Sequence, residues 1–99
     1  MKYIFFLIFI LVSTNIFADA SFFDDSKLDN PKLLKAIESY QGLEFETSKK
    51  LFTEIIESTS SRLEKATAIK YMAFIYTLAQ DDDNAEKYYA QLLHYYYHQ

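Results

Sequence analysis

The chain has 99 residues, 51% of them hydrophobic, which is room for one folded domain and excludes a disordered acidic tail. A single glycine and a single proline exclude a β-sandwich or small barrel, which need many turn residues, and favour helices. The absence of cysteine excludes disulfides and thiolate chemistry. With 10 basic and 14 acidic residues the net charge is −4, so we expect no nucleic-acid partner.

The first twenty residues have the layout of a secretory signal peptide. A positive start at Lys2 precedes an unbroken apolar run over residues 3–12, and Ala18 and Ala20 supply the small residues of a cleavage site. The run is shorter than the roughly 20 residues that span a bilayer. We therefore expect a signal peptide over residues 1–20, with cleavage after Ala18 as the near alternative, and a periplasmic or secreted protein. An uncleaved segment, which would anchor the domain to a membrane, is the other alternative.

Residues 21–29 are interpreted as a flexible lead, and residues 30–99 as a helical domain. Asn30-Pro31 is typical of a helix start, with a capping side chain followed by proline at the first helical position. Gly42 is placed to end this first helix. Apolar periodicity predicts three more helices, over residues 44–58, 62–80, and 84 to near the C-terminus.

Polar breaks separate the later helices. Ser61 and Glu64 form a capping box before the third helix, and Asp83 and Glu86 form one before the last. The third helix is apolar on two sides, which predicts burial on both sides and a central position. The short connections predict two antiparallel helical hairpins.

The two hairpins align with an offset of 37 residues. In this register small residues recur where two helices must approach closely, and large residues recur after them. The paired positions are Ala36 with Ala73, Ser48 with Ala85, Phe52 with Tyr89, and Ile55 with Leu92.

The second unit resembles a tetratricopeptide repeat, since it reads Met72-Ala73-x-x-Tyr76 and then Ala85-x-x-x-Tyr89-x-x-Leu92. It departs from the family pattern at Ile69 and Leu92 and lacks the closing proline. The first unit is weaker, with Ser39 for the tyrosine and Ser48 for the alanine, and the offset exceeds the family period of about 34 residues. The resemblance implies an all-α fold of two antiparallel helix–turn–helix repeats.

The same resemblance implies a concave groove, lined by the first helix of each hairpin, in which such proteins hold peptides. The groove positions would be Thr67, Lys70, Tyr71, Phe74, Thr77 and Leu78 in the second unit, and Asn30, Leu33, Leu34, Ile37, Tyr40 and Gln41 in the first. The selected partner site comprises Lys70, Tyr71, Phe74, Thr77, Tyr40 and Ile37, with Lys70 and Tyr71 as the main contacts. The alternative is that Tyr71, Phe74 and Leu78 are core residues packed on the first unit.

The last helix is rich in tyrosine, and no capping helix follows it. Tyrosine combines a large apolar area with a polar tip and is preferred at interfaces. We therefore predict a C-terminal interface formed by Tyr89, Tyr96 and Tyr97. The alternative is that Phe22-Phe23 or the helix itself covers this end.

Candidate catalytic and metal sites are weak. His94 and His98 share a helix face, as two zinc ligands would, but no third ligand lies at motif spacing. Asp81-Asp82-Asp83 lacks the glycine and glutamate of a calcium loop. A single glycine also excludes a glycine-rich phosphate loop. We expect no enzyme, no metal and no cofactor.

The sequence therefore predicts an exported, non-catalytic interaction module, an adaptor or accessory subunit of a cell-envelope complex. Its partner would be a protein or a peptide held on a preformed aromatic surface. The alternatives are a self-associating structural protein of the envelope, which would be a homo-oligomer, and a membrane-anchored helical domain.

Overall fold

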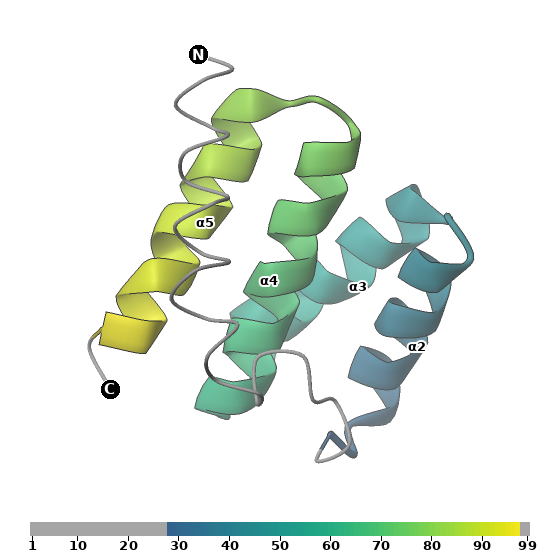
Figure 1. Ribbon diagram of the computed structural model, residues 1–99. Coiled ribbons are helices and arrows are strands. Elements are labelled where there is room, and N and C mark those ends of the chain that lie inside the picture. The colour runs from purple at the N-terminus through teal and green to yellow at the C-terminus, as the bar shows by residue number, and fades with distance from the viewer. Residues whose placement is uncertain (1–27, 98–99) are drawn as a thin grey trace.

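The computed structural model describes residues 28–97; the predicted signal peptide, most of the predicted lead and His98 lie outside these residues. Regular structure within residues 28–97 is entirely helical, which confirms the all-α prediction (Figure 1). The helices are α2 (Pro31–Gln41), α3 (Phe45–Ser58), α4 (Arg62–Leu78) and α5 (Asp82–Tyr97).

Helix α4 lies at the centre of the described domain. It packs against α5, with which it forms one hairpin, and against both α3 and α2, which form the other (Figure 1). Residues such as Tyr71 and Met72 of α4 belong to an apolar cluster shared with α2 and α3, whereas Ile69 and Ala73 belong to a second cluster shared with α5. The prediction that this helix is buried on two sides is confirmed.

The start of α2 follows the predicted signals. The Asn30 side chain accepts hydrogen bonds from the backbone N–H groups of Lys32 and Leu33, at 2.9 and 3.3 Å, and Pro31 is the first helical residue. Leu28, predicted to belong to the flexible lead, is buried in the first cluster. The last apolar residue of the lead is therefore part of the core.

The two hairpin turns have the same backbone structure, at the same offset of 37 residues. Leu43 and Gln80 adopt left-handed φ angles of 64° and 59°. The two hydrogen bonds of a Schellman motif follow in each turn: Leu43 N–H to Tyr40 O and Glu44 N–H to Ser39 O, then Gln80 N–H to Thr77 O and Asp81 N–H to Tyr76 O. Gly42 directly follows α2 as predicted, but its φ is −84°, so the left-handed residue is Leu43 and not the glycine.

The start of α5 differs from the prediction. The helix begins at Asp82, and the capping carboxylate is that of Asp81 rather than Asp83. Asp81 accepts hydrogen bonds from the backbone N–H of Asn84 at 3.2 Å and from its side-chain amide at 2.8 Å. The physical reason is the turn at Gln80, which ends α4 at Leu78 and makes Asp81 the first residue able to cap the next helix.

The register of the two hairpins is also visible in their packing. Each member of the pairs Ala36/Ala73, Ser48/Ala85, Phe52/Tyr89 and Ile55/Leu92 is buried. Small residues thus occupy equivalent close approaches in both hairpins, and large residues fill equivalent core positions. Among residues 28–97, no helix is long and apolar enough to cross a membrane.

Candidate functional site

Five of the aromatic side chains meet where α2, α3 and α4 converge, and we call them the aromatic cluster: Tyr40, Phe45, Phe52, Tyr71 and Phe74. Tyr71 is at its centre, with ring centroids 5.0 Å from Tyr40, 5.2 Å from Phe52 and 5.9 Å from Phe74. The Tyr71 and Phe52 rings are stacked, with an interplanar angle of 3°, and the other two pairs are edge-on. These are the favoured geometries for ring pairs, so the cluster fixes α4 against the first hairpin.

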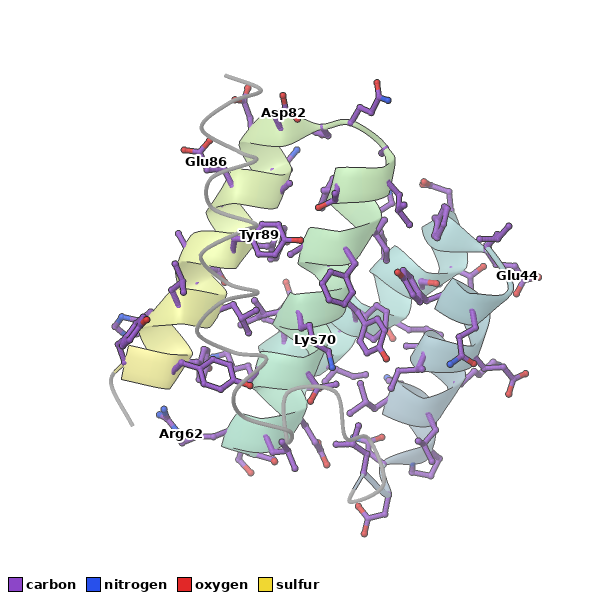
Figure 2. All side chains as sticks on the ribbon, in the orientation of Figure 1. Glu44, Arg62, Lys70, Asp82, Glu86 and Tyr89 are labelled. Atoms are coloured by element: carbon purple, nitrogen blue, oxygen red, sulfur yellow. The ribbon has the colours of Figure 1, made fainter. Side chains whose placement is uncertain are left out.

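The structure brings the predicted main contacts together, but it buries them. The Lys70 ammonium lies 4.8 Å from the centroid of the Tyr71 ring, within the range of a cation–π interaction. Lys70 is 3% exposed and Tyr71 is 8% exposed. Figure 2 shows the Lys70 side chain leaving the middle of α4. Because both side chains are packed, their prediction as accessible partner contacts is not supported by this arrangement.

The other residues of the predicted partner site differ from one another in how deeply they are buried. Ile37 is buried in the first core cluster, whereas Tyr40, Phe74 and Thr77 are half-buried. Burial raises the pKa of the Tyr40 hydroxyl. The alternative that assigns Tyr71 and Phe74 to the core therefore holds for Tyr71 and in part for Phe74, and Ile37 is a core residue as well.

Two other predicted groove positions do expose apolar area. Leu34 on α2 is 43% exposed and Leu78 on α4 is 58% exposed. Both come from the first helix of a hairpin, and these two helices pack on each other. The alternative assignment of Leu78 to the core is wrong, because the side chain lies near the end of α4 where the chain turns toward α5.

Tyr89 of the predicted C-terminal interface is a core residue. It is fully buried, and Figure 2 shows its ring between α5 and α4. The Thr77 hydroxyl donates to the Ala73 carbonyl at 2.7 Å, so the Tyr89 hydroxyl, 3.2 Å from it, is the donor in their shared hydrogen bond. Burial raises the pKa of Tyr89. Tyr89 can therefore contact a partner only if α5 leaves α4.

The remaining two residues of that predicted interface differ from each other. Tyr96 is half-buried and packs against the α4–α5 core cluster, whereas Tyr97 is 65% exposed. Tyr97 is therefore the member of the predicted C-terminal interface that offers most surface.

A further contact joins three helices and was not predicted. The Tyr76 ring of α4 stacks on the Tyr88 ring of α5, with centroids 5.6 Å apart and an interplanar angle of 10°. The Lys49 ammonium of α3 lies 5.4 Å from the Tyr76 centroid and 2.9 Å from the Glu46 carboxylate. The hydrogen bond that Lys49 donates to the Glu46 carboxylate raises the pKa of Lys49, and burial raises that of Tyr88. Helix spacing marks both tyrosines as apolar positions but gives no sign of a lysine arriving from another helix.

The described residues contain no group of three or more His, Asp or Glu side chains that could hold a metal ion. The acidic turn at residues 81–83 instead caps α5, and the hydrogen bonds from Asn84 lower the pKa of Asp81. His94 lies on α5, and its predicted companion His98 is outside the described residues.

No model of a known protein family matches this chain, and neither the curated proteins nor the solved structures contain a match.

Proposed function

We propose that the chain is an exported, non-catalytic protein–protein interaction module, an adaptor or accessory subunit of a cell-envelope complex. The observation that carries the proposal is the exposure of Leu34 and Leu78 on α2 and α4. The tetratricopeptide-like pattern assigns these same two helices to a peptide groove. Exposed apolar side chains on these helices supply the kind of contact that protein interfaces bury.

The packing of the helices is consistent with this proposal. The first helices of the two hairpins, α2 and α4, contact each other, and α4 also packs on α3. Tandem helical repeats stack in this way and use the surface along their first helices for binding. The proposal of export rests on the residues of the predicted signal peptide, 1–20, alone.

The test is a crosslinking pull-down of the tagged protein from its native cell envelope, using two matched double variants. Leu34→Glu with Leu78→Glu places charges on the proposed surface. Leu43→Glu with Ala90→Glu places the same charges on exposed apolar residues that lie outside these two helices, in the turn after α2 and on α5. We expect a stoichiometric partner that is lost in the first variant and retained in the second.

Two results would contradict the proposal. A partner retained by both variants would place the interface elsewhere, and a partner lost by both would indicate a nonspecific effect of added charge. Circular dichroism of each variant shows whether the helices persist, so that loss of binding is not confused with unfolding.

The second candidate function is self-association through the end of α5, and the exposure of Tyr97 favours it. Tyrosine is enriched in the buried centres of interfaces, where a charged residue is unfavourable. If this candidate is right, light scattering gives a mass above that of one chain, and Tyr97→Glu returns the protein to a monomer. A native chain that is monomeric at all concentrations excludes it.

A further inference from the structure

A pocket of about 370 Å³ opens between the first turns of α4 and the last turns of α5. It is separate from the surface proposed above, which involves α2 and the far end of α4. The side chains that line it are Arg62, Lys65, Ile69, Gln91, His94 and Tyr95. Its volume lies toward the lower end of the range of about 300–1,000 Å³ that is typical of small-molecule sites.

The charge of this pocket opposes the charge of the chain. Two of its six lining side chains, Arg62 and Lys65, are basic and none is a carboxylate, although the chain has 14 acidic and 10 basic residues. Neither Arg62 nor Lys65 forms an ion pair with a carboxylate among residues 28–97. The nearby carboxylate of Glu64 accepts from Thr59 at 2.7 Å and from Asn30 at 3.1 Å instead.

The Arg62 guanidinium is held in place before any ligand arrives. Its Nη2 donates to the backbone carbonyl of Tyr95 at 3.3 Å, and its central carbon lies 5.1 Å from the centroid of the Tyr95 ring. Figure 2 shows the side chain reaching from the start of α4 toward the end of α5. Arginine has five N–H donors, so several remain for a ligand. A guanidinium that is already ordered loses less entropy on binding than a free one.

The repeat architecture does not account for the pocket. In the 37-residue register Pro31, the first residue of α2, corresponds to Ala68, whereas α4 begins at Arg62. The extra turns at the start of α4 carry Arg62 and Lys65. On the partner helix, Gln91 and His94 correspond to Glu54 and Glu57 of α3, so the first hairpin has acids where the second has polar or basic residues. The basic pocket is therefore specific to the second hairpin.

We infer that this pocket binds a phosphate group carried by a small organic molecule or by a lipid headgroup. A phosphate monoester carries about 1.5 to 2 negative charges at neutral pH and three acceptor oxygens. Those charges match the cations of the pocket, and arginine binds such oxygens in pairs. The Tyr95 ring provides apolar surface for the organic part of the ligand.

The first experiment is a titration of the full chain with phenyl phosphate, followed by amide NMR shifts. We expect shifts confined to the start of α4 and the end of α5. Arg62→Gln with Lys65→Gln removes two charged donors and should weaken binding about tenfold or more. The matched control is Lys32→Gln with Lys35→Gln, which removes the same charge at the same spacing from the exposed first turns of α2.

Equal weakening of phenyl phosphate binding in both double variants would overturn the inference, because it would indicate that the ligand responds only to the overall charge of the protein. The absence of shifts at millimolar phenyl phosphate would also overturn it. Arg62 contacts the end of α5, so the double variant requires a check of its fold by circular dichroism. If it unfolds, the single variant Lys65→Gln decides, since no other side chain is bonded to Lys65 within the described residues.

Vesicle binding distinguishes the two sources of the phosphate. Vesicles of phosphatidylcholine are compared with vesicles that also contain phosphatidic acid, and binding common to all variants is subtracted. Retention by phosphatidic acid that is lost only in the Arg62/Lys65 variant assigns a lipid headgroup. Binding of phenyl phosphate without such retention assigns a soluble phosphate ester. If neither phenyl phosphate nor phosphatidic acid vesicles bind, the pocket is not a phosphate site. That result does not bear on the proposed groove on α2 and α4.

Discussion

Ser48 shows how a single position reports on the register of the two hairpins. It is a fully buried polar residue whose hydroxyl donates to the Glu44 carbonyl of the preceding turn at 2.9 Å. The equivalent residue of the second hairpin is Ala85, also fully buried. This position therefore requires a small side chain, and the hydrogen bond to Glu44 only compensates for the burial of the serine hydroxyl.

From this we predict that Ser48→Ala changes the free energy of unfolding by less than about 1 kcal/mol, because alanine favours the helix and leaves no polar atom unpaired. Ser48→Leu should lower it by about 1–3 kcal/mol through overpacking. Urea unfolding followed by circular dichroism measures both. A loss above about 1 kcal/mol for the alanine variant would mean that the serine hydroxyl contributes to the packing of α3.

Leu43 carries backbone strain with no compensating packing. Its φ of 64° is left-handed, and its side chain is 72% exposed. A left-handed conformation costs a non-glycine residue about 1–2 kcal/mol, whereas glycine costs about 0.5–1 kcal/mol through chain entropy. Leu43→Gly should therefore raise the free energy of unfolding by up to about 1 kcal/mol.

The matched test is Gln80→Gly in the equivalent turn, where φ is 59°. Thermal unfolding should show higher melting temperatures for both glycine variants. A decrease for either would mean that the original side chain stabilises its turn in a way that outweighs the backbone strain.

At the scale of single residues, the sequence predicts which side chains are neighbours better than it predicts how exposed those side chains are. The repeat pattern correctly places Lys70 and Tyr71 beside each other, because they are consecutive residues of α4. Their burial depends on Tyr40 and Phe52, which arrive from α2 and α3, and local spacing contains no record of those contacts. The same limit applies to Tyr89, whose hydroxyl finds Thr77 on the neighbouring helix.

A helix start was predictable where a single capping residue stands before the helix. Asn30 and Ser61 cap α2 and α4 as expected, since a single capping side chain stands before each helix. Three consecutive aspartates precede α5, and each is an equally good cap by type. The choice of Asp81 depends on the turn at Gln80, which no residue preference indicates.

The start of α4 carries a link between the two hairpins. The Ser61 hydroxyl accepts from the Glu64 N–H at 3.2 Å, but the Ser61 N–H donates to the Thr59 hydroxyl at 3.1 Å and not to the Glu64 carboxylate, so only one of the two bonds of the predicted capping box forms. The Glu64 carboxylate accepts instead from the Thr59 hydroxyl and from the Asn30 amide. It thereby joins the cap of α2 to the first turn of α4.

These bonds predict a pH dependence. The hydrogen bonds from Thr59 and then Asn30 lower the pKa of Glu64 from its usual 4.5. A lowered pKa means that the carboxylate stabilises the fold fully above pH 4.5, and that this contribution is lost as the pH falls through the folded value. We expect Glu64→Gln to be less stable than the native chain at neutral pH, by no more than about 1 kcal/mol because the group is near solvent.

The difference in the free energy of unfolding between the native chain and Glu64→Gln should shrink below pH 4.5, and urea unfolding at several pH values measures it. Glu38→Gln, at an exposed carboxylate of α2, controls for the loss of one negative charge. A difference that stays constant down to acid pH would exclude the hydrogen-bonded carboxylate as its cause.

The described domain as a whole consists of two hairpins, and α4 of the second hairpin also packs on the first. Because α4 contributes to both core clusters, neither hairpin has a complete core without it. Stacked repeats of this kind couple through their nearest neighbours. We therefore expect residues 28–97 to unfold as one cooperative unit rather than as two independent hairpins.

The equivalent residues Ile55 and Leu92 provide the last prediction. They are both 1% exposed, and they lie in the first and second clusters respectively. Truncation to alanine should lower the free energy of unfolding by about 2–5 kcal/mol in each case. The coupling through α4 adds a sharper expectation: Leu92→Ala should accelerate amide hydrogen exchange in α2, although α2 lies in the other cluster. If exchange rises only in α4 and α5 while α2 stays protected, the first hairpin is stable without the second and the described helices are two folding units.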